Sequence, residues 1–287
     1  MRDACVWASA TRELTYCAEY LLKAYLQTNR TEPFYRKLYD GAMLGIKSNL
    51  LQKSVAQDLV FTTELAPVPD GRGSYGMRRV PKQDHLVCFL GGSLMLGATE
   101  GRMSVPPPLE DFDDSQLDDW YMGAALVRTC VDTYARAKTG LAPEITYWHD
   151  PANVKAAQKD GRDWYINSRK RTYPDPPIDA RNILRPETLE SLLIAYRVSG
   201  DPIYRKWGWA IFEAFRKHCE LEDGAFASIR DVDEVPVKHE DNMETFWLSE
   251  SLKYLYLLFS DANLAPLDKV VFNTEVCTLS QGKVFSI

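Results

Sequence analysis

Apolar residues recur at helical spacing along much of the chain. The clearest stripe has members four residues apart, at Leu38, Ala42, Ile46 and Leu50. A helix with this spacing buries one continuous face against a neighbour. Comparable stripes predict further helices over residues 14–25, 114–134, 186–198, 201–219 and 242–260. The chain is therefore predicted to be mainly helical in both halves.

Short β-like runs lie between the predicted helices, at residues 59–64, 225–229 and 270–274. They are too short and too far apart to form a dominant sheet, so we expect them to be hairpin pieces at helix ends. Successive helix pairs with such decorations favour an all-α fold of stacked helical hairpins, either an α-solenoid or a closed α/α toroid. No strict sequence repeat chooses between the two.

Composition excludes several classes of protein. The chain has 287 residues, of which 45% are hydrophobic and 26% charged, which is typical of a folded globular protein. This length fits one large helical unit or two average domains. Forty acidic residues against 34 basic ones give a net charge of −6. No overall positive field therefore attracts phosphate backbones, and nucleic acid is not an expected partner.

The cellular compartment is only weakly indicated. No window reaches the run of about 18 uncharged apolar residues that a spanning helix requires, so neither a signal peptide nor a membrane anchor is expected in this chain. Six widely spaced cysteines without a CxxC pair indicate neither a disulfide-dense fold nor a zinc site. Asn29-Arg30-Thr31 is an acceptor tripeptide for N-linked glycan. Such a tripeptide also arises by chance, so it favours the secretory pathway only slightly.

The segment around Pro186 and Glu187 offers a candidate general base. Proline suits the first helical position, and Glu187 would then lie beside the positive end of the helix dipole, which keeps a carboxylate ionised. Glu190, three residues later, would lie on nearly the same face and could hold the water shell of a metal ion. The spacing alone favours an ordinary Pro-Glu helix start over a catalytic carboxylate.

A second acidic segment, residues 241–250, carries Glu244 and Glu250 with Phe246 and Trp247 between them. Aromatic faces beside carboxylates are typical of sites that hold a sugar ring. Alternatively, the two aromatic residues belong to the core and the acids face solvent. A third segment, residues 271–275, offers a hydroxyl, carbonyls and a carboxylate, which are oxygen ligands that suit calcium. An Asn-Thr-Glu sequence also commonly just ends a strand.

Taken together, several segments closely resemble the class I α-1,2-mannosidases of glycoside hydrolase family 47. The matching runs, in the same order and at similar spacing, are residues 84–90, 182–188, 252–255, 258–261 and 271–275. The resemblance covers roughly residues 16–277 and is strongest to the endoplasmic-reticulum mannosidases of fungi. It implies an (α/α)7 toroid that removes α-1,2-linked mannose from high-mannose N-glycans with inversion and requires Ca²⁺.

The resemblance also assigns roles to particular residues. Glu187 is the expected general base, and Thr274 is expected to bind calcium through its hydroxyl and carbonyl. The expected holders of the ion's waters are Glu190, Glu250 and Glu275, and the residues expected to contact the sugar are His85, Arg185, Glu244 and Phe246. Cys88 and Cys130 correspond to the family's disulfide, which agrees with glycosylation at Asn29 and a lumenal location in the endoplasmic reticulum or Golgi.

The first fifteen residues depart from the family's pattern, so we expect residues 1–15 to be a non-matching segment and residues 16–287 to be the C-terminal part of one catalytic domain. Aligning residues 19–23 with the family's motif puts Thr15 where a catalytic aspartate is expected. The general acid and any membrane anchor are expected in a region N-terminal to Met1. This chain alone is then expected to trim mannose poorly. A calcium-dependent, lectin-like mannose-binding module and a non-catalytic helical scaffold are the alternatives.

Overall fold

The computed structural model describes residues 11–69, 75–103, 105–149, 155, 157, 159, 161–167, 178–273 and 275–282. Its α-helices are α1 (Thr11–Gln27), α2 (Pro33–Asn49), α3 (Phe89–Thr99), α4 (Asp114–Ala135), α6 (Glu187–Ser199), α7 (Pro202–Cys219) and α8 (Leu252–Phe259). Short 3-10 helices are η1 (His85–Cys88), η2 (Leu109–Asp111) and η4 (Ile178–Ala180), and η5 (Trp247–Ser251) is a π-helical turn. The mainly helical character predicted from the sequence is confirmed.

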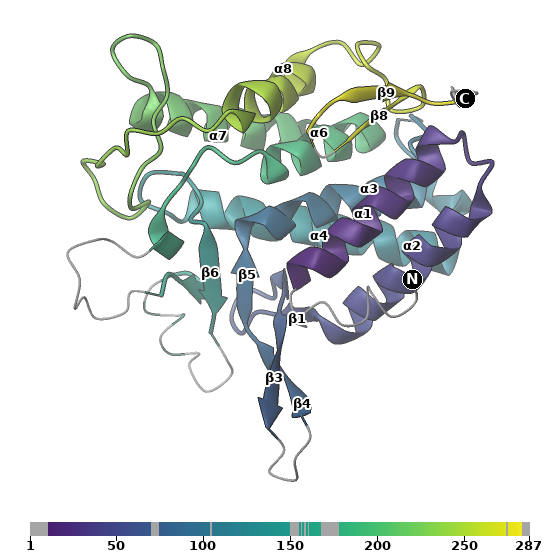
Figure 1. Ribbon diagram of the computed structural model, residues 1–287, viewed down its shortest axis with the longest axis horizontal. Coiled ribbons are helices and arrows are strands. Elements are labelled where there is room, and N and C mark those ends of the chain that lie inside the picture. The colour runs from purple at the N-terminus through teal and green to yellow at the C-terminus, as the bar shows by residue number, and fades with distance from the viewer. Residues whose placement is uncertain are drawn as a thin grey trace.

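The helices pack as successive pairs. α1 lies against α2, α3 against α4 and α6 against α7, while α3 also packs on α6 and α6 on α8 (Figure 1). This arrangement agrees with the predicted helical hairpins, because each amphipathic helix buries its apolar stripe against its partner and the next pair. Closure into a toroid stays a prediction. Among the described residues no helix is both long enough and apolar enough to cross a bilayer.

In the described part of the chain, four small antiparallel sheets decorate the helices. Their strands are β1 (Leu51–Lys53) with β2 (Val60–Thr62), β3 (Glu64–Pro69) with β4 (Tyr75–Val80), β5 (Lys82–Asp84) with β6 (Ile145–Trp148) and β7 (Trp164–Tyr165), and β8 (Val270–Phe272) with β9 (Thr278–Ser280). The predicted runs at 59–64 and 270–274 contain β2 and β8. The strand predicted at 225–229 is wrong, because this segment makes only isolated bridges to three separate partners, Asn182, Glu220 and His239.

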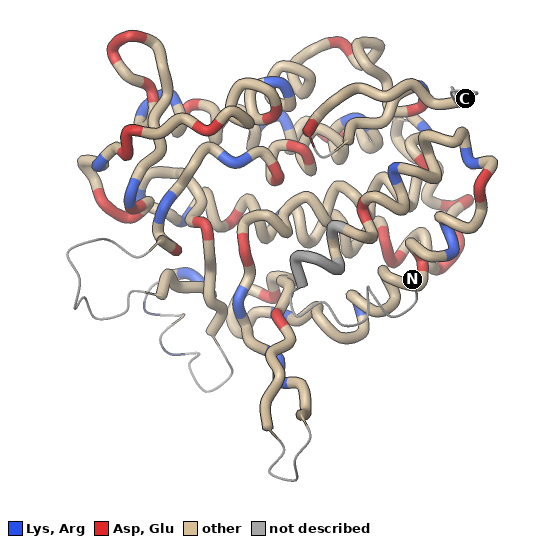
Figure 2. The backbone as a smooth tube through the Cα atoms, in the orientation of Figure 1, with Lys and Arg blue, Asp and Glu red and all other residues tan. Residues whose placement is uncertain are grey.

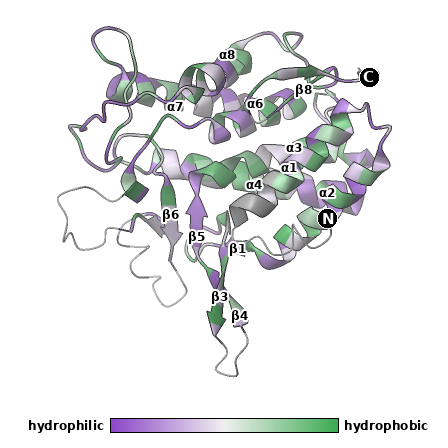
Figure 3. Cartoon of the chain, in the orientation of Figure 1, coloured by the Kyte–Doolittle hydropathy of each residue, from purple (hydrophilic) through white to green (hydrophobic). Residues whose placement is uncertain are grey.

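The central helix α3 was not predicted from the sequence. All eleven of its residues are buried, and Figure 3 shows its predominantly hydrophobic colour. A helix that is apolar all round has no polar face and therefore no helical periodicity to detect. Glycine permits its close packing, since a Cβ on Gly92 would lie 2.8 Å from the Cα of Ser191 in α6.

The helix predicted over residues 242–260 begins later than expected. Residues 242–244 are irregular, and the regular part opens with the π-turn η5 before continuing as α8. Hydrogen bonds within residues 240–244, such as that from the Asn242 side chain to Glu244, stabilise the non-helical path. Asn and Asp side chains compete with helix formation in this way.

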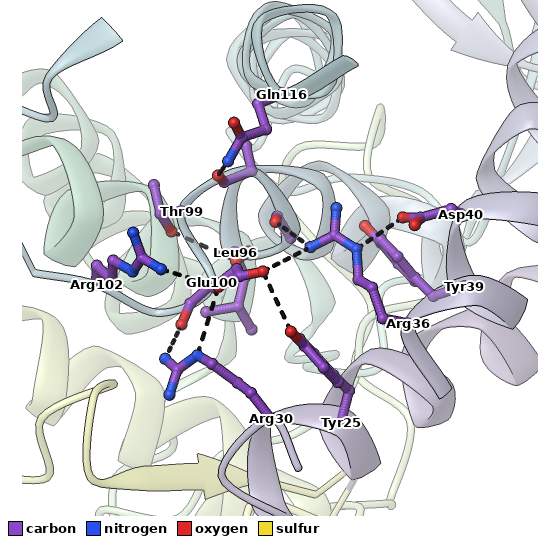
Figure 4. A network of polar contacts seen from close by, with 12 residues as sticks. Tyr25, Arg30, Arg36, Tyr39, Asp40, Leu96, Thr99, Glu100, Arg102 and Gln116 are labelled. Atoms are coloured by element: carbon purple, nitrogen blue, oxygen red, sulfur yellow. Dashed lines mark hydrogen bonds and ion pairs between the residues drawn. The ribbon is translucent and has the colours of Figure 1, made fainter. Parts of the chain in front are cut away.

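A polar network at the end of α3 fixes the α1–α2 pair (Figure 4). Glu100, in a left-handed conformation with φ 51°, follows α3 directly. Its carboxylate lies 3.5 Å from Arg36 of α2 and 3.6 Å from Arg30 of the connecting turn, and it accepts a hydrogen bond from Tyr25 of α1. One carboxylate therefore links three consecutive segments to the end of the central helix.

Candidate active site

A pocket of about 480 Å³ lies where α1, α3, α6 and the π-turn meet. Its walls are Glu19, Leu86, Phe89, Arg185, Pro186, Glu187, Glu190, Phe246, Glu250 and Glu275. Five of these ten residues are glutamates and only Arg185 is basic. Figure 2 marks acidic positions along α1, at the start of α6 and after α8. The pocket is thus strongly acidic and suits a cation or a hydroxyl-rich ligand.

An unusual turn delivers Glu187 to the pocket. Leu184 is fully buried and has a φ of 68°, a left-handed conformation that costs a residue other than glycine about 1–3 kcal/mol. Its N–H donates to the Asn182 side chain at 3.0 Å, and its carbonyl accepts from the Ser251 hydroxyl at 2.6 Å. Pro186 then caps α6 as the residue before its first turn, and Glu187 begins the helix.

Glu187 is buried but ionised. Its Oε2 lies 2.9 Å from Nδ1 of His85, and its Oε1 lies 3.6 Å from the Arg185 guanidinium. Burial is the largest single influence and raises the pKa of Glu187, but the hydrogen bond from His85 and the charges of His85 and Arg185 together outweigh it. The net result is a pKa below the ordinary value, so the carboxylate is ionised at neutral pH and can accept a proton. The sequence predicted an ionised Glu187 from its place at a helix start, whereas the contacts that lower its pKa most are those with His85 and Arg185.

Two further contacts orient this pair. Nε2 of His85 lies 2.8 Å from the Tyr134 hydroxyl while Nδ1 faces Glu187, so both ring nitrogens have a partner and the imidazole plane is fixed. Arg185 is held by Glu144, whose two carboxylate oxygens lie 2.8 and 3.0 Å from its Nε. Burial raises the pKa of Glu144, although Arg185 opposes that shift. Sequence reasoning missed Tyr134 and Glu144, which lie far from Glu187 along the chain.

A buried ion-pair network joins two glutamates of the pocket wall through Lys23. The Lys23 ammonium contacts Glu19 on its own helix and Glu190 on α6, the latter at 3.0 Å. All three residues are less than one tenth exposed. Burial raises the pKa of Glu19 to about 7 even though Lys23 opposes the shift, and Oε2 of Glu19 has no hydrogen-bond partner among the described residues. The i, i+4 Glu-Lys spacing in residues 19–23 was the available signal for this network.

The opposite wall comes from the π-turn. Glu250 is 7% exposed, and burial together with the charge of Glu275 raises its pKa to about 8. Phe246, just before the turn, lies beneath the Arg185 guanidinium at 5.9 Å from the ring centroid. Trp247 is fully buried in the core. The sequence left open whether the two aromatic residues hold a sugar or belong to the core. Phe246 lines the pocket, whereas Trp247 belongs to the core.

Most of the expected site residues converge. The pocket wall includes Glu187, Arg185, Glu190, Phe246, Glu250 and Glu275, while His85 lies behind Glu187. Glu244 is outside the wall, and Thr274 lies outside the described residues. Thr15 is buried one helical turn before Glu19.

Two further predictions concern the cysteines and the glycan acceptor Asn29. The disulfide predicted between Cys88 and Cys130 is confirmed, with its two Cα atoms 5.8 Å apart. It joins the end of η1 to α4. Asn29 is exposed in the turn after α1, where a glycan would not meet the pocket wall. Its glycosylation stays a prediction.

The described side chains contain no group of three or more His, Cys, Asp or Glu placed to bind a metal ion directly. The remaining expected ligand, Thr274, is not among the described residues.

Comparison with known proteins identifies the family: this chain belongs to glycosyl hydrolase family 47, whose sequence profile matches residues 10–280. Over 90% of the chain it is 43% identical to the mannosyl-oligosaccharide 1,2-alpha-mannosidase MNS3 of Arabidopsis thaliana. Over a similar share it is 39% identical to the endoplasmic reticulum mannosyl-oligosaccharide 1,2-alpha-mannosidase of Saccharomyces cerevisiae. The resemblance inferred from the sequence motifs is thus confirmed.

The fold has a solved counterpart in the alpha-1,2-mannosidase from Trichoderma reesei. The two structures align with a TM-score of 0.73 at 26% sequence identity, over 92% of this chain and 50% of that one. The chain likewise spans 41% of the length of the Arabidopsis relative and 45% of the yeast relative.

Proposed function

We propose that this chain supplies the general base and the sugar-holding wall of a calcium-dependent, inverting α-1,2-mannosidase site. The observation that carries this proposal is Glu187, a carboxylate kept ionised at the wall of an acidic pocket by His85 and Arg185. The relatives named as 1,2-alpha-mannosidases indicate the substrate, terminal α-1,2-linked mannose on high-mannose N-glycans. The relatives from the endoplasmic reticulum indicate a lumenal location.

Inversion requires a water molecule between the base and the anomeric carbon of the sugar. Glu187 can accept a proton from such a water, because it lines the pocket and its carboxylate is ionised. The Phe246 ring offers an apolar face to the sugar, and the Arg185 guanidinium above it can donate hydrogen bonds to sugar hydroxyls. These residues would hold the mannose ring with its anomeric carbon toward the base.

Calcium fits the composition of the pocket. Carboxylate oxygens dominate the wall, and the buried Oε2 of Glu19 lacks a partner among the described residues. Hard oxygen donors of this kind suit Ca²⁺ or the waters around it. We infer that Thr274 would bind the ion and that Glu190, Glu250 and Glu275 would hold its waters. When bound, calcium supplies positioning of the sugar hydroxyls.

None of the residues assigned above serves as the general acid. An inverting glycosidase needs a second carboxyl group to protonate the leaving oxygen, and we infer that the family's acid lies in a part of the domain that this chain does not span. Hydrolysis of a natural glycosidic bond by this chain alone is therefore expected to be slow. A substrate whose leaving group departs without protonation would require the general base and the sugar-binding residues but no general acid.

α-D-Mannosyl fluoride is such a substrate, because fluoride departs without protonation. We expect the chain to release fluoride from it faster in Ca²⁺ than in EGTA, and proton NMR should show β-mannose as the first product. Fluoride release at the uncatalysed rate would overturn the proposal. If calorimetry then showed calcium-dependent binding of α-1,2-mannobiose, the pocket would instead be the lectin-like module.

A further inference from the structure

The two walls of the pocket are joined by one buried hydroxyl. Ser251 is the last residue of the π-turn η5, directly after Glu250, and it is fully buried. Its Oγ donates to the carbonyl of Leu184 at 2.6 Å. Leu184 precedes Arg185 and lies three residues before Glu187, so this hydrogen bond connects the segment that carries Phe246 and Glu250 to the segment that carries the base.

The bonded residue is also the strained one. Leu184 keeps a φ of 68° although its side chain is apolar and fully buried. A residue other than glycine stays in this conformation only where its surroundings hold it there. Two hydrogen bonds do so. The N–H donates to Asn182, which is itself anchored by donating to the Ala142 carbonyl at 2.8 Å, and the carbonyl accepts from Ser251.

The direction of the chain after Leu184 decides where the base lies. A return of Leu184 to an ordinary negative φ would rotate the following peptide and move Arg185 and the first turn of α6 relative to the π-turn. Asn182 and the Glu144–Arg185 ion pair lie on the Arg185 side of the site. Among the described contacts, Ser251 is the one that bonds the left-handed residue directly to the Phe246 side.

We propose that Ser251 is a positioning residue, whose hydroxyl holds Leu184 in its left-handed conformation and thereby sets the Glu187 carboxylate against the Phe246 wall of the pocket. The inference rests on the proposed function for its catalytic consequence. It assigns to Ser251 no contact with the sugar. Its effect on the reaction is carried entirely by the backbone of residues 184–187.

The first test compares two serines of the same π-turn. Ser251→Ala removes the hydrogen bond, whereas Ser249→Ala removes an exposed hydroxyl that donates to the Thr245 carbonyl. For α-mannosyl fluoride in Ca²⁺ we expect Ser251→Ala to lower kcat about 10-fold or more with little change in KM. A displaced Glu187 slows the chemical step, whereas the residues that bind the sugar stay in place. Ser249→Ala should match the wild type. Equal kcat values for both variants and the wild type would overturn the proposal.

The second test asks whether the hydroxyl acts through the backbone conformation of Leu184. Leu184→Gly and Leu184→Ala both remove the buried side chain, but only glycine adopts a positive φ without strain. We expect Ser251→Ala to reduce kcat less in the Leu184→Gly background than in the Leu184→Ala background. Identical reductions in the two backgrounds would show that Ser251 does not act by holding this turn.

The third test does not depend on turnover. The ¹³C signal of the Glu187 carboxyl, assigned by its loss in Glu187→Gln, is titrated in the wild type, Ser249→Ala and Ser251→Ala. We expect Ser251→Ala alone to shift the titration, because a moved carboxylate changes its contacts with His85 and Arg185. If the wild type fails on mannosyl fluoride, the proposed function falls while this titration still decides the role of Ser251. An unchanged titration overturns the positioning role.

Folding of the variant is controlled within the same series. If Ser251→Ala does not fold, Ser251→Cys fills the same space with a much weaker donor and is measured instead. Ser251→Thr keeps the hydroxyl and should retain the wild-type titration of Glu187. A Thr variant that folds but shifts the titration as far as Ala does would contradict the proposal.

Discussion

The Glu187 carboxylate shows how neighbours outweigh burial at the scale of a single residue. Burial alone would raise its pKa, whereas the His85 hydrogen bond and the His85 and Arg185 charges lower it. The sequence predicted an ionised Glu187 from its place at a helix start. It could not predict His85 as the hydrogen-bond partner from spacing, because 102 positions separate the two residues and only the family resemblance placed them in one site.

Loss of the His85 contact should be visible in the pH dependence. A general base works only when deprotonated, so activity falls as the pH drops through its pKa. For mannosyl fluoride we expect the acid limb of the wild-type profile to lie below the ordinary glutamate value of 4.5. His85→Ala should move this limb to higher pH, because burial raises the pKa of Glu187 and the His85 contact that lowers it is lost.

The matched control is His239→Ala, whose ring contacts the backbone carbonyl of His218 and does not line the pocket. Its acid limb should coincide with that of the wild type. An acid limb that stays in place in His85→Ala would mean that another interaction keeps Glu187 ionised.

At the scale of secondary-structure elements, amphipathic helices were predictable and uniformly apolar ones were not. α2 and α7 each present one apolar stripe; α7 begins one residue after its predicted segment 201–219 does, whereas α2 begins five residues before the predicted stripe at Leu38 and ends just before Leu50. α3 has no polar face to reveal its period, so it was overlooked although it lies at the centre of the molecule. The π-turn was not predicted either, and its Ser251 contacts Leu184, a residue 67 positions away that helical spacing does not relate to it.

The disulfide between Cys88 and Cys130 should stabilise the α3–α4 pair. It closes a loop across 42 positions, and the loop-entropy model gives roughly 4 kcal/mol of stabilisation for a loop of this size. Cys88→Ala/Cys130→Ala should therefore lower the free energy of unfolding in urea by about that amount. The exposed Cys277 lies outside the disulfide, so Cys277→Ala is the control and should unfold like the wild type. Equal stability of all three proteins would show that the bond contributes little.

At the scale of the whole molecule, the pocket gathers residues from segments far apart in the sequence. Glu19 lies on α1, Glu187 and Glu190 on α6, and Glu250 on the π-turn. The acidic motifs were predictable one by one, but their distances depend on the packing of α1 and α3 against α6. The buried Glu19–Lys23–Glu190 network belongs to this level as well, because it exists only once α1 meets α6.

Calcium should stabilise the whole fold. The acidic residues around the pocket repel one another. Burial is the largest cause of the raised pKa of Glu250, and the negative charges of the neighbouring glutamates raise it further. A cation that binds only the folded state adds about 2.7 kcal/mol at 100 times its Kd. We therefore expect the thermal midpoint to rise with Ca²⁺ concentration and to fall in EGTA. Thr274→Val should lose most of this response, and Mg²⁺ should produce less of it. Identical midpoints in Ca²⁺ and EGTA would contradict the calcium assignment.

The central claim is that Glu187 is the base of an inverting mannosidase site, and replacing it tests this claim most directly. Glu187→Gln keeps the size of the side chain but cannot accept a proton from water. On α-mannosyl fluoride in Ca²⁺ we expect kcat to fall by about 100-fold or more with KM nearly unchanged. Glu222→Gln, a change at an exposed glutamate outside the pocket wall, should leave both constants as in the wild type. Turnover by Glu187→Gln at the wild-type rate would contradict the account.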